Sequence, residues 1–296
     1  MTRLARPAAL LVEALIAVAL FGCIPVLVRF VDANPWTIGI VRLAIATAGL
    51  AVLLRFRGEL RRPSGGDALR LALIGAVFFA HWATYFFAIK ISSASIGAIG
   101  LSTYGAHLLV LGAIAGLGRL HAVDLLSLGA VLAGAVIIVP EPNLSNRTTA
   151  GLALAILSAI LYATLPILHQ RWSHLGSGTR ALGQFSVALA LFLLFLPKAN
   201  WNLGARDWAG LAFLAIGSTL IAHTLWVRVT TRLSPSASSL LYYGNLPVAL
   251  ALSALVLGER LSSRMLLGAA LIVAGSAGGL ASQWKRRAFE ATRSTR

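Results

Sequence analysis

The sequence predicts an all-α integral membrane protein of ten transmembrane helices, built as two inverted five-helix repeats with both termini in the cytoplasm. Composition is the first reason, because 58% of the residues are hydrophobic and only 11% are charged. Pattern is the second reason, because continuous apolar runs of about 20 residues recur between short polar breaks, whereas a membrane barrel would alternate. The third reason is a motif that occurs once in each half of the chain.

The motif is clearest in the second half, where Tyr243-Gly244 is followed by Leu-Gly-Glu-Arg-Leu at 257–261. A fainter copy in the first half contains Tyr104-Gly105 and Leu-Gly-Arg-Leu at 117–120. Further residues match in the same order, which indicates two related halves. These pairs are Pro25 and Pro166, His81 and His223, Gly129 and Gly268, and Gly134 and Gly275.

The apolar runs place the spans in chain order. The first run follows Arg3 and Arg6, as in a signal peptide, but it is long enough to span and is predicted to be retained. Short breaks between later runs favour antiparallel neighbours, and a turn-rich segment at 140–143 separates the fifth run from the sixth. The spans are predicted at 9–31, 35–54, 68–90, 92–117, 122–139, 149–172, 178–197, 206–231, 235–257 and 262–283.

These spans divide the chain into four parts. Residues 1–140 form the first five-helix repeat, 141–148 a linker, 149–283 the second repeat, and 284–296 a basic cytoplasmic tail. A half with an odd number of spans ends on the opposite side from its start, so the second repeat is inverted relative to the first.

The net charge of +16 fits the membrane rather than nucleic acid. Basic residues lie in the breaks, mostly on the side of the N-terminus, which the positive-inside rule assigns to the cytoplasm. No basic patch with interleaved aromatics occurs on a soluble stretch, so nucleic acid is not an expected partner. The one cysteine, Cys23, lies in an apolar run and gives neither a disulfide within the chain nor a metal site, and no cofactor is expected.

Over nearly its whole length the chain resembles the drug/metabolite transporter superfamily, in particular its ten-helix EamA-type exporters. The resemblance is carried by Leu246-Pro247-Val248, the segment 257–261 and the run Gly-Ala-Ala-Leu-Ile-Val-Ala-Gly at 268–275. Arg42 resembles an arginine that this family often has in its second helix. The first half departs from the pattern at Leu108, where a proline is expected, and lacks the glutamate of the Leu-Gly-Glu-Arg segment.

The resemblance implies a secondary active transporter that exports small amphipathic metabolites across the bacterial inner membrane by alternating access. The aromatic content of the middle spans is similar to that of exporters of aromatic and related amino acids. The implied partners are the small-molecule substrate and the lipid bilayer. The Gly112-x-x-x-Gly116 and Gly275-x-x-x-Gly279 motifs fit packing within the chain or a dimer, so the oligomeric state stays open.

Two alternatives belong to other classes of function. One is a transporter of the same superfamily that carries another solute, either a drug-like cation or a nucleotide sugar or phosphate ester. A transporter of phosphate esters is expected to have several basic residues in its middle spans, where this chain has only Arg42. An intramembrane enzyme is the other, but the chain has no Gly-x-Ser-x-Gly, no His-Glu-x-x-His and no paired intramembrane aspartates. The chain is therefore not expected to be an enzyme.

Candidate substrate-binding residues share helical stripes with His81 and His223. Ionisable groups inside a membrane usually face the bundle interior or a cavity, and we expect both imidazoles to be neutral there. They either line a central path or hold the repeats together by hydrogen bonds. Trp82, Trp201, Trp208 and Trp284 are instead predicted in interface or lipid-facing belts. The candidates are Phe78, His81, Tyr85, Tyr104, His107, Tyr162, His223, Trp226, Tyr243 and Asn245.

Four further residues have two interpretations each. Arg42 lies inside a span, so it is predicted to bind carbonyls, in particular those at helix ends, or hydroxyls, water or a substrate carboxylate. Glu13 either carries a proton or pairs with an arginine near the membrane surface. Pro25 and Pro166 each remove a hydrogen bond within a helix and act as gates or as static kinks. The cavity is predicted between spans 1, 3 and 4 and their repeat partners 6, 8 and 9.

Overall fold

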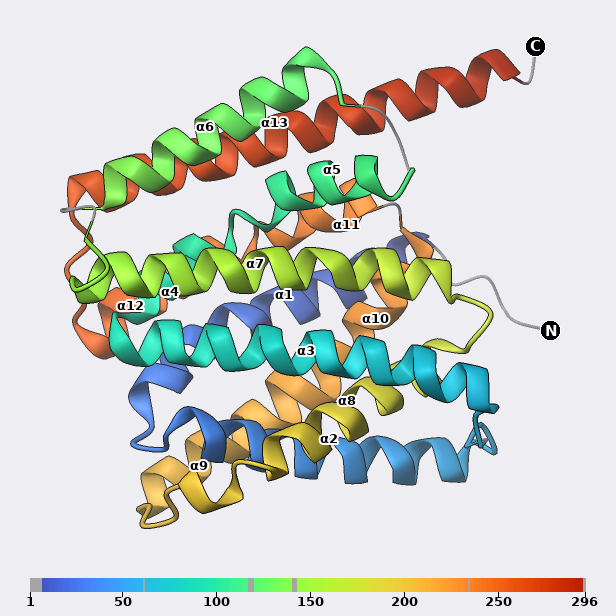
Figure 1. Ribbon diagram of the computed structural model, residues 1–296, viewed down its shortest axis with the longest axis vertical. Coiled ribbons are helices and arrows are strands. Elements are labelled where there is room, and N and C mark those ends of the chain that lie inside the picture. Colours follow the sequence, from blue (N-terminus) through green and yellow to red (C-terminus); the bar gives the residue numbers. More distant parts are fainter. Residues whose placement is uncertain (1–6, 61, 117–119, 140–142, 234, 295–296) are drawn as a thin grey trace.

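The computed structural model describes residues 7–60, 62–116, 120–139, 143–233 and 235–294. Within these ranges every regular element is helical (Figure 1). The first seven helices are α1 (Pro7–Phe30), α2 (Pro35–Phe56), α3 (Gly65–Ile91), α4 (Ala94–Leu101), α5 (Tyr104–Ile114), α6 (Ala122–Ile138) and α7 (Arg147–Arg171). They are followed by α8 (Ser177–Leu193), the 3₁₀ turn η1 (Leu196–Lys198), α9 (Ala205–Phe213), the π-helix η2 (Leu214–Ile221), α10 (Ala222–Arg232), α11 (Pro235–Tyr242), α12 (Asn245–Leu257) and α13 (Ser263–Ser294).

Eight helices in the described part of the chain are long and apolar enough to cross a membrane, which points to a multi-pass membrane protein. Three of these are runs that the structure divides, namely Ala94–Ile114, Ala205–Arg232 and Leu240–Leu257. Helices α6 and α8, with 17 residues each, are shorter than these eight, which have at least 18 residues. Helix α13 continues through residues 284–294, so most of the predicted basic tail is helical.

The interruptions differ from the continuous spans that we predicted at 92–117, 206–231 and 235–257. Between α4 and α5, the Thr103 N–H bonds to Gly100 O, and between α11 and α12 the Gly244 N–H bonds to Leu241 O. These tighter i→i+3 bonds replace the α-helical ladder for one turn. The second break falls on Tyr243-Gly244, where glycine weakens helix formation, and the first, at Ser102-Thr103, comes immediately before Tyr104-Gly105.

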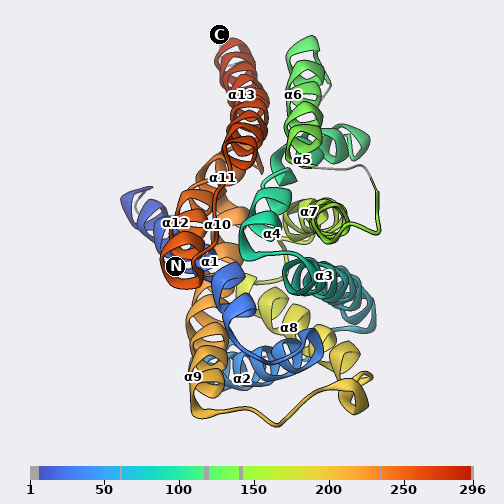
Figure 2. The ribbon, with the colours of Figure 1, turned by 90° about the vertical axis from the view of Figure 1, so that its left-hand side faces the viewer.

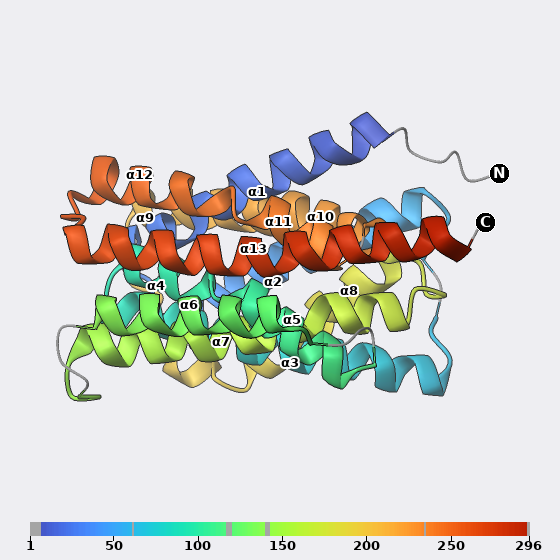
Figure 3. The ribbon, with the colours of Figure 1, turned by 90° about the horizontal axis from the view of Figure 1, so that it is seen from above.

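Helices α3 and α1 each pack mainly against two other helices. Helix α3 lies against α7 and α8, while α1 lies against α12 and α10 (Figures 1 and 2). Helix α2 packs on α8 and on η2. Helices α6 and α13 form a separate pair at one edge of the bundle, visible from above in Figure 3.

Helix α1 begins and α13 ends at the same end of the bundle, which we call the terminal end; the opposite end is the far end (Figures 1 and 3). At the terminal end Glu13 forms an ion pair with Arg228, which is one of the two roles predicted for it. At the far end Asn200 accepts from Asn34 N and donates its own N–H to Thr37. Polar bonds between elements thus tie both ends.

Glu259 connects the two halves at the far end. Its carboxylate accepts from Ala94 N at 2.8 Å, from Ser95 N at 3.0 Å and from Ser95 Oγ at 2.6 Å. The acid therefore caps the N-terminus of α4, where free N–H groups and the helix dipole favour a negative charge. This contact accounts for the glutamate of the Leu-Gly-Glu-Arg segment, which the first half lacks.

Candidate functional site

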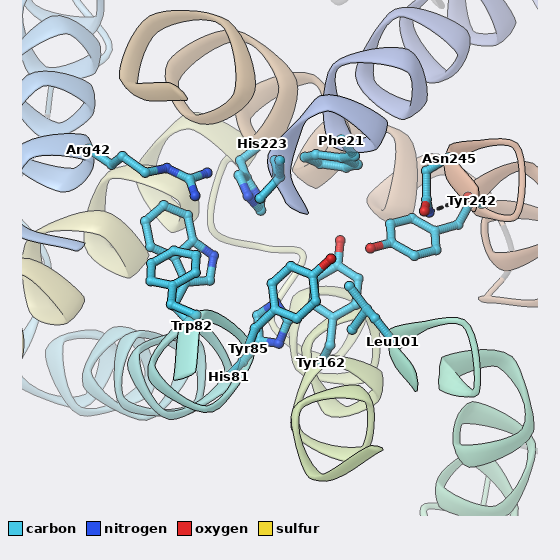
Figure 4. Close-up of a pocket in the computed structure, with 12 residues that line it drawn as sticks. Phe21, Arg42, His81, Trp82, Tyr85, Leu101, Tyr162, His223, Tyr242 and Asn245 are labelled. Atoms are coloured by element: carbon cyan, nitrogen blue, oxygen red, sulfur yellow. Dashed lines mark hydrogen bonds between the residues drawn. The ribbon is translucent and has the colours of Figure 1, made fainter. Parts of the chain in front are cut away.

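A small buried pocket lies where the two interrupted helix pairs approach α1, α2, α3, α7 and α10 (Figure 4). Its volume is about 20 Å³, which is room for little more than one water molecule. Any larger solute requires the surrounding helices to separate. The lining residues are Phe21, Ile24, Arg42, His81, Trp82, Tyr85, Phe86, Leu101, Tyr162, His223, Tyr242 and Asn245.

Arg42 brings a cation into this pocket from α2 and is fully buried. Its guanidinium lies over Trp82, 4.0 Å from the ring centroid, and its Nε donates to Thr219 Oγ1 at 3.0 Å (Figure 4). Within the described residues neither terminal nitrogen has a hydrogen-bond partner. We predicted carbonyls at helix ends as one set of partners; the structure provides a hydroxyl and an aromatic face, and two nitrogens that can still donate.

The π-helix η2 places Thr219 beside Arg42. Thr219 donates its hydroxyl to Leu214 O at 2.7 Å, five residues back, and accepts from Arg42 Nε. The hydroxyl therefore has a fixed direction, with its lone pairs toward the guanidinium. π-Helical turns are frequent at functional sites, and they turn a residue out of the regular α-helical register.

His81 has a defined tautomer in its neutral form. Ser158 Oγ donates its one hydrogen to His81 O at 2.9 Å. The same hydroxyl lies 2.7 Å from His81 Nδ1 and must therefore be the acceptor in that contact. Ser158 O, at 3.1 Å from Nδ1, is also an acceptor. We therefore assign the proton to Nδ1, which leaves Nε2 as an acceptor. The imidazole stacks on Tyr162 with ring centroids 4.6 Å apart.

His223 lies between the central pocket and a second, smaller cavity, and it lines both. Its ring is enclosed by Phe21, Phe78 and Trp82, with centroids 4.7, 5.1 and 5.5 Å away. Its Nε2 has no hydrogen-bond partner among the residues that the structure covers. A buried polar atom without a partner is costly and commonly marks a place where a ligand or water binds.

The second cavity, of about 10 Å³, lies on the α7, α8 and α10 side of His223. His169 and Gln184 face each other there, with Nε2 and Oε1 2.9 Å apart. Arg180 is fully buried nearby, bonding His169 O and Thr231 Oγ1. The remaining lining residues are Tyr162, Leu165, Pro166, Trp226, Val227 and Thr230.

A group of tyrosines forms the wall opposite Arg42 (Figure 4). The rings of Tyr104, Tyr162 and Tyr242 lie with their centroids 5.1 to 5.4 Å apart. Trp226 contacts Tyr242 at 5.6 Å and so extends the aromatic wall toward the second cavity. Such a wall offers flat apolar faces together with hydroxyl groups.

The structure places most of the predicted site residues in or beside the two cavities. The central pocket contains Arg42, His81, Tyr85, Tyr162, His223 and Asn245. Phe78 lies behind it against Trp82, Tyr104 lies in the tyrosine wall, and Trp226 and Pro166 line the second cavity. Pro25 is buried next to Ile24 of the pocket.

Two predicted residues lie away from both cavities. Tyr243 packs against Gly105, Leu109 and Leu280, on the side of α5 and α13. His107 is half-buried and faces Thr103 Oγ1 at 3.1 Å. The helix break at Tyr243-Gly244 turns Tyr243 outward, and its neighbour Tyr242 occupies the pocket instead.

The prediction for Trp82 was wrong. We expected it in a lipid-facing belt, but it is 2% exposed and forms the surface on which Arg42 lies. Phe21, Ile24, Phe86, Leu101 and Tyr242 are further lining residues that the sequence did not single out. Leu101 and Tyr242 flank the two helix breaks, so the repeated Tyr-Gly pair was the available signal for them.

Comparison with known proteins gives a family for the second half of the chain. Residues 149–279 match the EamA-like transporter family. A comparison with curated proteins finds no significant match. Among solved structures, one crystal structure has a TM-score of 0.68 at 18% sequence identity, covering 92% of this chain and 97% of its own, which shows a shared fold.

The family match indicates a membrane transporter of the drug/metabolite type. It agrees with the expectation that the chain is no enzyme, because the matched family consists of transporters. A small-molecule substrate and membrane lipid are the partners that such a transporter implies.

Proposed function

We propose that the protein is a secondary active transporter that exports small amphipathic metabolites, aromatic and other amino acids foremost, from the bacterial cytoplasm across the inner membrane. The observation that carries this proposal is the arrangement of Arg42 opposite the tyrosine wall. Its two unpartnered nitrogens form a fork that matches a carboxylate. The rings of Tyr162 and Tyr242, on the other side of the pocket, suit an aromatic or apolar side chain.

The polar groups between these walls suit the amino group of a zwitterion. His81 Nε2 is an acceptor in the tautomer assigned above. Asn245 donates its amide nitrogen to Tyr242 O at 2.6 Å, which leaves its side-chain oxygen as a second acceptor. A solute held by Arg42 at its carboxylate is therefore within a pocket that also contains acceptors for an ammonium group.

Alternating access is supported by the correspondence of helix contacts between the halves. Exchanging the two halves converts the α3–α7 contact into α10–α1, the α5–α7 contact into α12–α1, and the α3–α8 contact into η2–α2, and all six pairs are packed. The two helix breaks at the pocket correspond in the same way. Interrupted helices at matching positions of inverted repeats are where transporters of this type bind their substrates.

This correspondence favours ten membrane-crossing segments in two inverted repeats, 1–140 and 149–283, joined by the linker 141–148. Residues 141 and 142 of the linker lie outside the described ranges. The family match at 149–279 falls within the second repeat. The positive-inside rule then assigns the terminal end, and with it the basic tail 284–296, to the cytoplasm. Rocking of the repeats about the pocket would open either end in turn, with Pro25 and Pro166 as the flexible points of α1 and α7.

Other solutes of the superfamily fit the pocket less well. The described lining residues include one arginine and no Asp or Glu, so a drug-like cation lacks a counter-charge. A nucleotide sugar or phosphate ester carries more negative charge than a single guanidinium balances. A monocarboxylate solute is the class that this lining favours.

The test is transport by purified protein in liposomes, using phenylalanine, phenethylamine, phenylpropionate and a quaternary ammonium compound. We expect the two carboxylates to be transported and the two cations not. Arg42→Gln should reduce phenylalanine transport at least about tenfold, because a hydrogen bond to a charged group contributes roughly 1.5–3 kcal/mol. Arg206→Gln is the matched control, since Arg206 also lies on a ring, that of Phe30, but outside the pocket. Transport of either cation, or phenylalanine transport that is unchanged by Arg42→Gln, would contradict the proposal.

A further inference from the structure

A large groove opens on the terminal half of the bundle, apart from the two cavities of the candidate site. It has a volume of about 1140 Å³, and its walls are α2, the start of α3, the α7–α8 connection, η2 and α10. No described residue lines both this groove and the central pocket. Binding sites for drug-sized ligands typically reach about 300–1,000 Å³, so the groove has room for a ligand of lipid size.

The groove exists because α2 and α10 are not packed against each other. Helix α2 is held by η2 and α8, whereas α10 is held by α1, α7 and α8. Large apolar side chains at the opening are exposed, with Val52 at 54%, Leu53 at 38% and Ile221 at 44%. In a membrane these side chains face hydrocarbon, so the groove is open to the acyl chains of the bilayer.

Both walls change from apolar to charged toward the terminal end. Along η2 and α10 the lining residues Leu220, Thr224, Arg228 and Arg232 recur every four residues, and therefore follow one helix face. On α2 the lining residues Gly49, Leu53 and Arg57 recur in the same way. With about 5.4 Å per turn, each wall passes from hydrocarbon depth to the membrane surface within two to three turns.

The middle of the α10 wall carries an unsatisfied hydroxyl. Thr224 Oγ1 is buried and has no hydrogen-bond partner among the described residues. It lies one turn deeper than Arg228. In a phospholipid the ester carbonyls likewise lie just below the phosphate, and they accept hydrogen bonds from hydroxyl groups.

The charge left over at the rim is positive. Of the four lining arginines, Arg228 is paired with Glu13, and of the two lining acids, Asp67 is paired with Arg70. Among the lining residues, Glu59 is then the one acid left to balance the charge of Arg57, Arg62 and Arg232. All four side chains are exposed. Arginines between membrane helices near the surface bind phosphate groups of lipids, because the guanidinium fork matches phosphate oxygens.

We propose that this groove is a binding site for one anionic glycerophospholipid. Its phosphate lies between Arg57 on α2 and Arg232 on α10, an ester carbonyl reaches Thr224, and an acyl chain lies along Leu53 and Leu220. The inference is independent of what the central pocket transports, because the two sites share no described lining residue.

The test is lipid retention by the purified full-length protein, measured by native mass spectrometry. The probes are phosphatidylglycerol and phosphatidylcholine with the same two oleoyl chains, together with soluble glycerophosphoglycerol. We expect phosphatidylglycerol to be retained on the order of tenfold better than phosphatidylcholine, because each basic residue near the surface contributes roughly 1 kcal/mol. Glycerophosphoglycerol, which lacks the chains, should not compete.

Variants separate this site from the general basicity of the terminal end. Arg57→Gln with Arg232→Gln should abolish the preference, and each single change should weaken it. The matched control is Arg55→Gln with Arg171→Gln, which removes the same charge from exposed arginines outside the groove and should leave the preference intact. Thr224→Trp should reduce retention of both lipids by filling the groove.

Three results would overturn the proposal. One is equal retention of the two lipids by the unaltered protein. Another is the same preference in the groove variant and in its control. The third is displacement of the lipid by glycerophosphoglycerol or by a transported solute, which would make the groove an anion site or a substrate vestibule. Because the single variants each remove one exposed side chain, the test does not depend on the double variant being stable.

Discussion

His81 and His223 are both buried at the pocket, but their surroundings differ. His81 is held by Ser158 through two contacts, whereas the Nε2 of His223 has no partner among the described residues. His81 is thus fixed in orientation, and His223 has a polar atom available at the boundary between two cavities. The matched positions in the sequence do not imply matched roles.

For each histidine we expect His→Gln to retain more substrate exchange than His→Ala. Glutamine can donate and accept hydrogen bonds in a polar cavity, as a neutral imidazole does. The measurement is exchange of labelled phenylalanine across liposomes, with expression and thermal stability as controls. If one histidine carries the coupled proton, its glutamine variant will lose accumulation driven by a pH gradient while exchange persists. Unchanged exchange and accumulation in all four variants would assign both histidines to packing alone.

Individual site residues were predictable where their chemistry is unusual in a membrane. Arg42, His81 and His223 stand out because charged or ionisable groups are rare in apolar spans. Tyr242 and Tyr243 could not be told apart, because a helix break turns one inward and the other outward. Trp82 was misplaced because amphipathic tryptophans usually lie at interfaces, and only the fold shows that Arg42 lies over this ring.

Helices α6 and α13 approach each other at small residues. A Cβ added at Gly134 would lie 2.6 Å from Gly268 O, and one added at Gly268 would lie 2.6 Å from Gly134 O. Gly275 and Gly279 of the predicted small-residue motif face Ser127 of α6. These glycines therefore serve packing between two helices of the same chain, which was one of the two predicted uses.

Gly134→Val should destabilise the protein by about 1–3 kcal/mol, as overpacking of a tight contact does. Gly112→Val is the matched control, because a Cβ at Gly112 of α5 meets nothing within 4 Å. Both changes replace a helical glycine by the same β-branched residue, so propensity effects are comparable. The measurement is thermal unfolding of purified protein in detergent. Equal midpoints for the two variants would show that the α6–α13 contact does not limit stability.

Glu259→Ala should weaken the N-terminus of α4 by about 1–2 kcal/mol, because the N–H groups of Ala94 and Ser95 lose their acceptor. Glu59→Ala, at an exposed acid on the terminal end, is the control and should change little. Hydrogen exchange at the start of α4 reports the local effect. Unchanged protection of Ala94–Ile96 in the Glu259 variant would exclude a capping role.

The apolar runs predicted the helix positions to within a few residues, except at the end of α13, which continues to Ser294. Hydropathy determines which segments are long enough to span, but not how far a helix extends beyond the membrane. The interruptions at Ser102-Thr103 and Tyr243-Gly244 were not predictable from hydropathy, since apolar residues flank both. The π-helix also could not be predicted from hydropathy, because it changes the hydrogen-bond register of the helix and not its composition.

At the scale of the whole molecule, topology is the property on which the transport mechanism depends. We expect a reporter fused after residue 296 to be cytoplasmic, and one inserted at 143–146, between α6 and α7, to lie on the opposite side. Paired fusions to a fluorescent protein and to a periplasmic phosphatase measure this. A cytoplasmic signal from both sites would contradict the inverted arrangement.

The pseudo-symmetric contacts could not be derived from the motif alone. Matching residues such as His81 and His223 predict that the halves are related, but they do not predict which helices touch. Packing depends on small residues such as Gly134 and on polar bonds such as those of Asn200. The contacts of these residues can be assigned only when the partner helix is known.

Helices α6 and α13 contribute no described residue to either cavity of the candidate site. Their outward side chains include Leu126 and Val136, each 73% exposed. These positions are therefore suitable attachment points for fluorophores or spin labels, after replacement of Cys23, the single cysteine of the chain. A label there occupies neither cavity, so it would report movement of the helices during transport without blocking the candidate site.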